Sequence, residues 1–513
     1  MKNNMKKTML LTTAMMALAG NATAQKQPNI IVIFADDMGY GDVSYAGELS
    51  KIPTRNLDQM AAEGVVFTDA HTSSSVSTPS RYGLLTGRYN WRSTLKRGVV
   101  NGYSKSLIKP DRETIASMLR RQGYTTAAIG KWHLGWDWNN VDAGEKNVDF
   151  SKPIENGPTT HGFDYWYGLC ASLDMPPYVY VENDRATALP DRITSGKGMG
   201  FWRKGPTAPD FVHEEALPNF TQRACRYITE KAKSDQPYFL YFPLPAPHTP
   251  ILPTKEFQGK SGLNPYGDFV MMVDDVVGRV LQAVEATGEA QNTIVIFSTD
   301  NGCSPEAHIG ELQKKGHHPN HIYRGMKSDL FEGGHRVPLL LRWPKKAKPH
   351  KVEQTVCLTD LYATFADINK YKLKDNEAED SYSLLPAIRS KKAVKTIREA
   401  TVHHSIDGDF TIRQGRWKLL LAAGSGGWSY PGRNAKDIAN GKLPKVQLYD
   451  IEADPKERKN VQAEHPDVVR HLTGLFLKYV RDGRSTPGAP QQNDHDGSGK
   501  NWYQLQKVLD MNK

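Results

Sequence analysis

The 513-residue sequence predicts an α/β fold built on a parallel or mixed β-sheet. Residues 29–35 and 293–298 are continuous β-branched and apolar runs, typical of strands buried on both faces of such a sheet. A helical segment at 114–122 ends at Gly123 and leads into a further strand at 124–129. The length and the 39% content of hydrophobic residues allow a large core and more than one domain.

Acidic and amide side chains follow the first two strands. Asp36 and Asp37 come directly after the first strand, and Asp300 and Asn301 follow the second. Because ligands of open α/β sheets bind outside the carboxyl ends of the strands, we expect these two ends to meet. Oxygen ligands alone suit a hard cation such as Ca²⁺ or Mg²⁺ rather than zinc. An Asp-Asp pair after a strand is also often only a turn or a helix cap.

The first 24 residues have the pattern of a secretory signal peptide. Three lysines precede a mainly apolar stretch at 9–19, and a small-residue cleavage motif follows at Ala22, Thr23 and Ala24. The apolar stretch is too short to span a bilayer, and no other stretch is long enough for a membrane helix. We therefore expect cleavage near Ala24, no integral membrane segment, and a mature protein that is periplasmic or secreted.

Charge and cysteine content narrow the function only slightly. Loss of residues 1–24 lowers the formal net charge from +10 to +7, because three lysines and no acidic residues are removed. This excess is compatible with a polyanionic substrate, and a solvated basic surface explains it equally well. There is no nucleic-acid motif, so no nucleic acid partner is expected. The widely spaced cysteines predict small buried residues or at most two disulfides: Cys170, Cys225, Cys303 and Cys357.

Residues 77–88 read STPSRYGLLTGR. This segment resembles the signature of the formylglycine-dependent sulfatases of the alkaline-phosphatase superfamily, where Cys or Ser, then Pro, Arg and a later Thr-Gly-Arg stand at these positions. A Ser- and Thr-rich stretch before a helix is otherwise a common surface loop with an N-cap. A nucleophile at a loop-to-helix junction, however, lies beside free backbone N–H groups and a dipole that favours an anion such as a sulfate ester.

The resemblance implies a modified nucleophile. Ser77 would be oxidised to formylglycine, whose hydrate attacks the sulfur atom. The Ser form of the motif implies an oxygen-independent route, in which an anaerobic sulfatase-maturating enzyme acts before export. Arg81, one helical turn after Ser77, is expected to reach the modified side chain. The resemblance also places one Ca²⁺ ion on five side chains: Asp36, Asp37, Ser77, Asp300 and Asn301.

The strand at 124–129 ends in the motif GKWHLG, residues 130–135. This motif is similar to a sulfatase element in which the lysine binds the substrate sulfate and the histidine is a base. The resemblance implies these roles for Lys131 and His133. A histidine between Trp and Leu is otherwise ordinarily a hydrogen-bonded packing residue.

Two later motifs complete the resemblance. The strand at 238–242 runs into PLPAPHTP, whose prolines make a rigid loop around His248, and residues 323–338 resemble the family's Arg-Gly-x-Lys and Glu-Gly-Gly-x-Arg-x-Pro elements. The resemblance implies that His248 is a sulfate ligand and the acid toward the leaving oxygen, and that Lys327 bridges both groups. Residues 332–338 are expected to be a structural turn. Taken alone, the prolines indicate only a stiff connection. A lone lysine in a polar loop, such as Lys327, would usually be a solvated side chain.

The motifs lie in family order between residues 29 and about 343, and the resemblance then weakens. It implies a large mixed central sheet sandwiched by helices in an N-terminal catalytic domain, residues 25–385. Short strand-like runs and an amphipathic helix at 465–481 fit a smaller C-terminal subdomain, residues 386–513, with an antiparallel sheet plus helix. The Gly-rich loop at 422–441 is a candidate wall of the substrate cleft.

The sequence thus predicts an exported carbohydrate sulfatase acting on a sulfated glycan. Residues 170–178 look similar to the subfamily acting on 6-sulfated galactose or N-acetylgalactosamine, which favours exo-action on such a sugar. The alternatives are another sulfate position or sugar, a phosphatase or phosphodiesterase on the same fold, and a glycan-binding protein with unmodified Ser77. The candidate substrate residues are Asp174, His213, His404 and Trp428, each of which also has an ordinary structural interpretation.

Overall fold

The computed structural model describes residues 26–141, 147–392, 394–494 and 502–511. The predicted signal peptide, residues 1–24, lies outside this part of the chain. Within the described residues, no helix combines the length and the apolar character needed to cross a bilayer.

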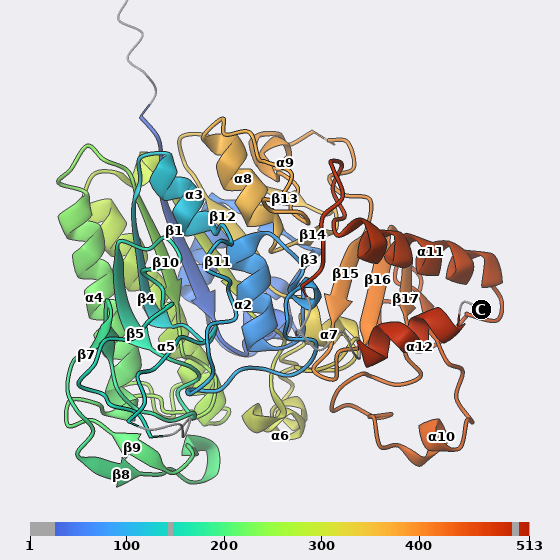
Figure 1. The fold of residues 1–513 in the computed structure, drawn as a ribbon, viewed down its shortest axis with the longest axis horizontal. Helices are drawn as coiled ribbons and strands as arrows, with labels where there is room; N and C mark the ends of the chain where they lie inside the picture. The colour runs from blue at the N-terminus through green and yellow to red at the C-terminus, as the bar shows by residue number, and fades with distance from the viewer. Residues whose placement is uncertain (1–25, 142–146, 393, 495–501, 512–513) are drawn as a thin grey trace, which may run out of the picture.

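A ten-stranded mixed sheet forms the centre of the molecule (Figure 1). Its five middle strands pair with one another in parallel. In spatial order these strands are β11 (Thr293–Thr299), β1 (Asn29–Ala35), β10 (Tyr238–Pro243), β4 (Thr125–Lys131) and β5 (Tyr165–Leu169). Antiparallel pairs join at both sides, so the predicted mixed sheet is confirmed.

The outer strands of this sheet are short. On one side lie β12 (Leu339–Arg342), β2 (Val65–Phe67) and β13 (His350–Val352). On the other side lie β6 (Val181–Glu182) and β7 (Arg185–Ala186). Two small ladders stand apart: β3 (Ala70–His71) with β14 (Val356–Cys357), and β8 (Arg192–Thr194) with β9 (Gly205–Thr207).

Helices cover both faces of the sheet, which explains why β1 and β11 are buried along their whole length. One group packs together from α1 (Arg55–Glu63), α4 (Ala216–Lys231) and α5 (Pro265–Ala286). The other group consists of α2 (Ser77–Thr86), α3 (Ile115–Arg121) and α8 (Asp360–Ile368). Figure 1 shows the second group in front of the strands.

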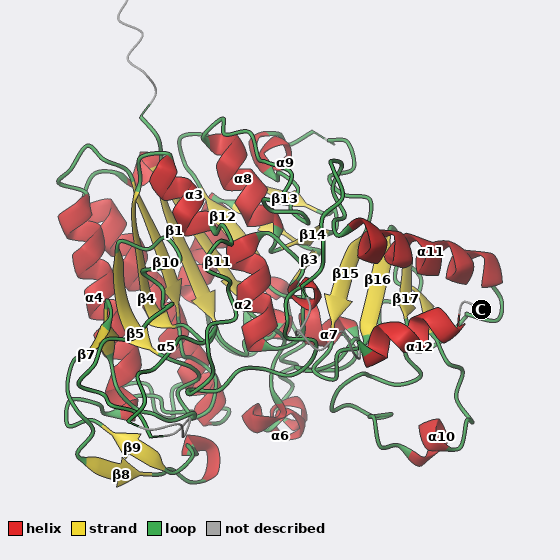
Figure 2. Cartoon of the chain, viewed as in Figure 1, coloured by secondary structure: helices red, strands yellow, loops and turns green. Residues whose placement is uncertain are grey.

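A second, smaller sheet follows toward the C-terminus (Figure 2). It is antiparallel and consists of β15 (Thr401–His404), β16 (Phe410–Gln414), β17 (Trp417–Leu420) and β18 (Gln447–Asp450). Two helices accompany it, α11 (Pro466–Asp482) and α12 (Tyr503–Met511). The predicted antiparallel sheet with a helix is therefore present, and its core includes Trp91 from the N-terminal part.

The domain boundary predicted at residues 385/386 falls at the start of α9 (Leu385–Arg389). Ile388 of this helix packs in the core of the larger part, and the smaller sheet begins at Thr401.

Two further short helices are α6 (Ile309–Lys314) and α10 (Lys436–Ala439). The expected turn at 332–338 contains a short helix, α7 (Glu332–His335). All four cysteines are free, and all except Cys225 are buried.

A buried ion-pair network joins the smaller sheet to the larger part. Lys418 of β17 lies 3.0 Å from Glu332 and 2.8 Å from Glu457, measured between its Nζ and the Oε1 atoms, and all three side chains are fully buried. Burial, together with the nearby Glu332 carboxylate, raises the pKa of Glu457 to about 7. Since an unpaired buried charge is costly, this contact favours one fixed docking of the two parts.

Candidate active site

The register of β1 and β11 brings two acidic strand ends side by side. Ala35 pairs with Thr299, so the residues that follow each strand emerge at the same level. The backbone N–H of Asp37 donates to Asp300 Oδ1 at 3.1 Å, and Asn301 Nδ2 donates to Asp37 Oδ1 at 2.7 Å. The structure thus brings all four predicted metal ligands from the strand ends together in a buried cluster: Asp36, Asp37, Asp300 and Asn301.

Three cations from distant parts of the chain neutralise these carboxylates. Arg81 NH2 lies 2.8 Å from Asp300 Oδ2. Lys131 Nζ lies 2.5 Å from Asp36 Oδ2, and Lys327 Nζ lies 2.7 Å from Asp37 Oδ2. The three cations come from α2, from the end of β4 and from the loop before α7.

The pKa of Asp36 reflects this arrangement. Burial opposes ionisation of the carboxyl group, but Lys131, His248 and Arg81 outweigh it and lower the pKa of Asp36 to about 2. Asp36 is therefore negatively charged at neutral pH. A cluster of this kind can hold a cation through its carboxylates and an anion through its lysines.

Ser77 is the first residue of α2 and faces the cluster. Its Oγ donates to Asp36 Oδ1 at 3.4 Å and lies 3.5 Å from Lys131 Nζ. The position places the hydroxyl at a helix N-terminus, where backbone N–H groups and the helix dipole favour an anion. Arg81 lies one turn later, as expected, and its hydrogen bond goes to Asp300 rather than to Ser77.

His133 follows β4 in a left-handed backbone conformation, with φ +57°. Its Nε2 lies 2.8 Å from the Val100 carbonyl oxygen, which can only accept, so Nε2 carries the proton and Nδ1 keeps its lone pair. Burial, Lys131 and Arg81 hold the pKa of His133 well below its usual value. The neutral imidazole can therefore accept a proton at Nδ1, as a base must.

His248 lies beside the cluster, in the proline-rich loop after β10. Its Nδ1 lies 2.5 Å from the Thr249 carbonyl oxygen, so that nitrogen is a donor. Its Nε2 lies 3.6 Å from Asp37 Oδ2. The side chain is 11% exposed, so part of it is accessible to solvent.

Ser172 is a site residue that the sequence reasoning missed. Its Oγ lies 3.0 Å from Lys131 Nζ and 3.2 Å from His248 Nδ1, so the hydroxyl connects the two side chains. Ser172 follows β5, which pairs with β4 in parallel so that Lys131 faces Leu169. No strand was predicted at 165–169 from the sequence, so no signal there would place Ser172 beside Lys131.

Asp174 and His213 both contact the loop that joins β8 to β9. Asp174 forms an ion pair with Arg203. Burial raises the pKa of Asp174, but His248 and Arg203 outweigh it and lower the value below that of an ordinary Asp. His213 stacks on Trp202 with ring centroids 3.9 Å apart, and burial lowers the pKa of His213 to about 3. Asp174 thus lies close enough to the cluster to interact with His248 and Lys131, and His213 packs among aromatic rings.

Trp428 and His404 belong to the C-terminal part. The backbone N–H of Trp428 donates to Ser328 Oγ at 2.9 Å, directly beside Lys327, and the Trp428 residue is 50% exposed. His404 is buried, and its ring packs 5.3 Å from that of Phe410 in the C-terminal core. The Trp428 backbone is therefore bonded to the residue after Lys327, whereas the His404 ring packs within the protein.

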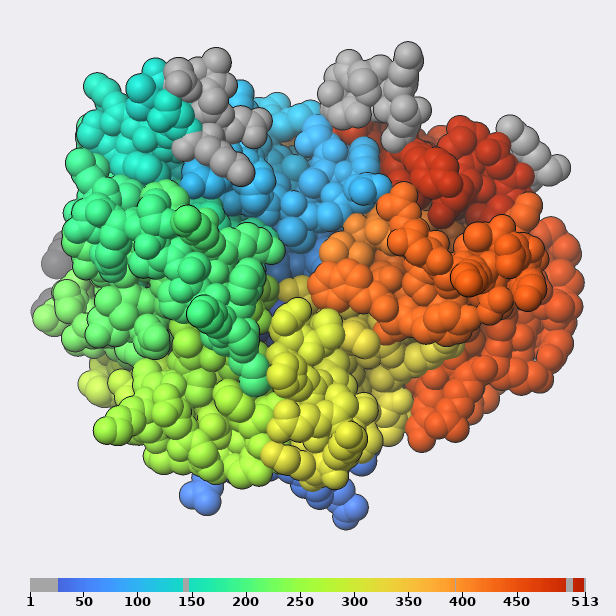
Figure 3. All heavy atoms as spheres, turned by 90° about the horizontal axis from the view of Figure 1, so that it is seen from below, coloured from blue at the N-terminus to red at the C-terminus, as the bar shows by residue number. Residues whose placement is uncertain are grey.

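The loop that carries Lys327 is held by the smaller sheet and its loops. Leu330 N–H donates to the Ser425 carbonyl at 2.7 Å, and Glu332 N–H donates to Glu457 Oε2 at 2.7 Å. Seen from below in Figure 3, green, yellow and orange segments meet around a hollow, so the face is shared by distant parts of the chain. The C-terminal part therefore helps to build the site.

The donor set fits a hard cation. Asp36, Asp37 and His248 each offer a ligand atom, and these atoms lie within 4.8 Å of one another. Among the described residues, the buried Oδ1 of Asn301 has no hydrogen-bond partner. The amide nitrogen of the same side chain donates to Asp37 Oδ1, so Asn301 belongs to the cluster. With Asp300 added, oxygen donors dominate, which is the chemistry of Ca²⁺ or Mg²⁺ sites.

A family model described as "Sulfatase" matches residues 28–370, about two thirds of the chain. The chain belongs to the sulfatase family. The resemblance seen in the motifs is thereby confirmed, and this sulfatase is a sulfuric ester hydrolase.

Several relatives are similar over nearly the whole length. An N-acetylgalactosamine-6-O-sulfatase of Bacteroides thetaiotaomicron is 34% identical over 495 residues, which cover 89% of this chain and 94% of that protein. Human arylsulfatase A is 30% identical over 502 residues, which cover 93% of this chain and 92% of that protein. A solved structure from work on the metabolism of multiple glycosaminoglycans by Bacteroides thetaiotaomicron superposes with a TM-score of 0.78 at 33% identity, covering 88% of this chain and 99% of that one.

Ser172→Ala should lower kcat/KM for a sulfate ester by about 10-fold, the loss expected when one hydrogen bond to a charged group disappears. The hydroxyl holds Lys131 and His248 in place, so its removal leaves both side chains less well fixed. Steady-state kinetics measure the effect, and Ser234→Ala, at an exposed site, is the matched control. An unchanged kcat/KM in Ser172→Ala would show that the hydroxyl has no part in the reaction.

Proposed function

We propose that this sulfatase hydrolyses the 6-O-sulfate ester of a terminal galactose or N-acetylgalactosamine in a glycan. The observation that carries the proposal is the 34% identity, over 89% of the chain, to a protein named N-acetylgalactosamine-6-O-sulfatase. The buried carboxylate of Asp174 supports it, because a polar group beside the cluster can accept hydrogen bonds from sugar hydroxyls. A site built on such bonds rejects sugars that leave its polar groups unpaired.

The nucleophile in this proposal is a formylglycine made from Ser77. The motif at 77–88 and the orientation of Ser77 Oγ toward Asp36 and Lys131 support this assignment. The modified side chain supplies a hydroxyl of an aldehyde hydrate as nucleophile. We infer that an anaerobic sulfatase-maturating enzyme makes it before export.

The metal in this proposal is one Ca²⁺ ion, held by Asp36, Asp37, Asp300, Asn301 and the modified residue 77. When bound, it supplies positive charge beside the nucleophile. The oxygen-rich donor set supports calcium over zinc.

The protein's own side chains carry out the remaining chemistry. Lys131 Nζ lies 3.5 Å from Ser77 Oγ, and Lys327 Nζ lies 2.7 Å from Asp37 Oδ2. At these positions their charges can neutralise the oxygens of a sulfate group. His248 is the candidate acid that protonates the departing sugar oxygen. His133 accepts a proton at Nδ1, because its Nε2 is bonded to the Val100 carbonyl.

We also propose that the protein is exported to the periplasm or secreted, on the basis of the signal-peptide pattern in residues 1–24. Export would place the enzyme where sulfated glycans of other organisms are available.

Protein isolated from its native host should carry formylglycine at position 77. Trypsin releases residues 56–81 as one peptide, and mass spectrometry should find this peptide two hydrogens lighter than the sequence predicts. Protein from a host without the Ser-type maturation system should fold normally but have little activity. Full activity with an unmodified peptide would contradict the mechanism and favour direct use of Ser77.

Chelation should abolish turnover, and Ca²⁺ should restore it better than Zn²⁺, because hard oxygen donors form the cluster. The measurement is the initial rate of sulfate release after dialysis against a chelator and titration with each metal. Recovery that depends on zinc would favour a phosphatase-like centre instead.

The substrate is tested with defined sulfated sugars that carry sulfate at the 2-O, 3-O, 4-O, 6-O or N position of galacto and gluco rings. We expect sulfate release from position 6 of a terminal galacto-configured sugar, measured by ion chromatography. Preference for a gluco ring, another position or an internal sugar would overturn the substrate assignment and leave the sulfatase chemistry intact.

A further inference from the structure

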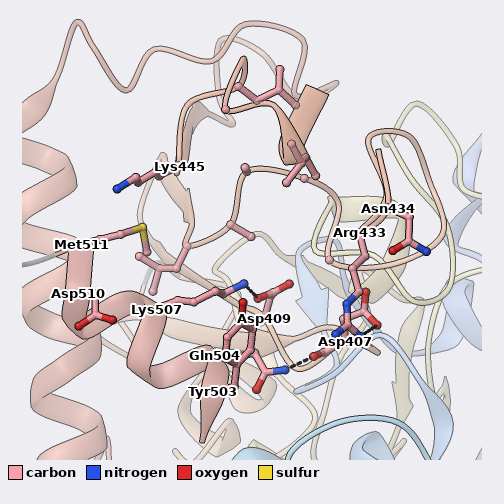
Figure 4. A pocket seen from close by; sticks show the side chains of 18 residues that line it. Asp407, Asp409, Arg433, Asn434, Lys445, Tyr503, Gln504, Lys507, Asp510 and Met511 are labelled. Carbon is pink, nitrogen blue, oxygen red and sulfur yellow. Dashed lines mark hydrogen bonds and ion pairs between the residues drawn. The ribbon is translucent and has the colours of Figure 1, made fainter. Parts of the chain in front are cut away.

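Three neighbouring hollows lie on the C-terminal side of the molecule, with volumes of about 580, 530 and 490 Å³. Arg433 lines all three, and the three hollows together are here called the Arg433 groove. The largest hollow lies between the loop that carries Arg433 and α12 (Figure 4). No role in the sulfatase chemistry described above accounts for this groove.

The groove lies next to the loop that carries Lys327. Trp428 lines one of its hollows, and the Trp428 backbone donates to Ser328, the residue after Lys327. The N–H of Ile406 donates to the Ser328 carbonyl at 3.1 Å. Asp407, the next residue, lines two of the hollows. The wall that positions Lys327 is therefore also the wall of the groove.

The lining of the groove suits a carbohydrate chain. Three aromatic side chains are unusually exposed there, since Trp428, Tyr430 and Tyr503 are 50%, 70% and 60% exposed. Aromatic rings present an apolar face on which the C–H face of a sugar can pack, and Tyr and Trp add polar groups. The lining of the largest hollow also includes Leu421, Leu443 and Gln504, whose amide nitrogen donates to the Asp407 carbonyl.

The charges of the groove favour an anionic chain. All three of its aspartates have partners, because Lys507 Nζ lies 2.7 Å from Asp409 Oδ1, Arg433 NH1 lies 3.8 Å from Asp407 Oδ1, and Gln506 Nε2 donates to Asp510 Oδ1 at 2.9 Å. The two ion pairs are drawn in the view of Figure 4. Lysines and arginines outnumber the aspartates in the lining: Lys96, Arg97, Arg433, Lys445 and Lys507 against Asp407, Asp409 and Asp510. The Arg433 side chain is 54% exposed, so its guanidinium faces the open groove.

We propose that the Arg433 groove binds the acidic sugars that follow the sulfated terminal sugar of an oligosaccharide. Arg433 pairs with a carboxylate or sulfate of the second or third sugar, and the exposed aromatic rings support the sugar rings. This inference rests on the proposed glycan sulfatase function and extends it, because it makes an acidic oligosaccharide, rather than a single sugar, the preferred substrate.

The test compares two values of kcat/KM. One is for a 6-sulfated monosaccharide, and the other is for an acidic tetrasaccharide whose terminal sugar is that same sulfated monosaccharide. Arg433→Ala should lower the value for the tetrasaccharide by about tenfold, as expected for the loss of a charge-assisted contact, and change the monosaccharide value less than about twofold. Arg433→Lys should recover part of the loss. Arg226→Ala, at an exposed position of α4, is the matched control.

A second measurement separates this inference from the proposed function. Protein that retains serine at position 77 is titrated with the acidic tetrasaccharide by calorimetry, which requires no turnover. Weaker binding in Arg433→Ala with unchanged binding in Arg226→Ala supports the groove even if the wild-type enzyme fails to cleave either sugar, an outcome that would contradict only the proposed substrate. Equal tetrasaccharide binding and equal kcat/KM ratios in Arg433→Ala and wild type overturn the inference.

Discussion

The ion pairs between the ends of β1 and β11 and three buried cations are the interactions on which the site depends. Parallel pairing forces Asp36, Asp37 and Asp300 into one small volume, where three carboxylates would repel one another. Arg81, Lys131 and Lys327 neutralise them, and each arrives from a different element. The need to collect these charges in one place explains why segments separated by more than 200 residues meet at this edge of the sheet.

The same charge balance prepares the chemistry of the sulfatase. Lysines that stabilise carboxylates in a buried cluster are already desolvated, so they can act on an anionic sulfate without a large rearrangement of solvent. The two histidines differ in a corresponding way. His133 is buried and held neutral by its surroundings, whereas His248 stays partly exposed in the rigid loop after β10. Environment rather than residue type thus distinguishes the proposed base, His133, from the proposed acid, His248.

Sequence reasoning predicted the parts of this structure that depend on local pattern. The strand at 29–35 has the expected bounds, since an unbroken apolar run is buried on both faces. It did not identify Ser172, whose importance comes from the pairing of β4 with β5, nor the hairpin of β8 and β9, whose short strands are partly exposed. The short helix α7 replaced an expected turn because Glu457, far along the chain, accepts a hydrogen bond from its first residue. Such features depend on contacts between distant residues, which no local pattern contains.

The hold of the C-terminal part on the Lys327 loop has a consequence for how this enzyme can change over time. Residues 425 and 457 fix the backbone around Lys327 through hydrogen bonds, while the neighbouring loop carries Trp428 and Arg433 at the surface. Inherited variation in the exposed part of that loop can alter which glycan is accepted, while variation at its inner contacts would disturb Lys327, the lysine proposed to bind sulfate. Diversity among descendants of this chain should therefore accumulate on the outer side of the loop, with its inner side held constant.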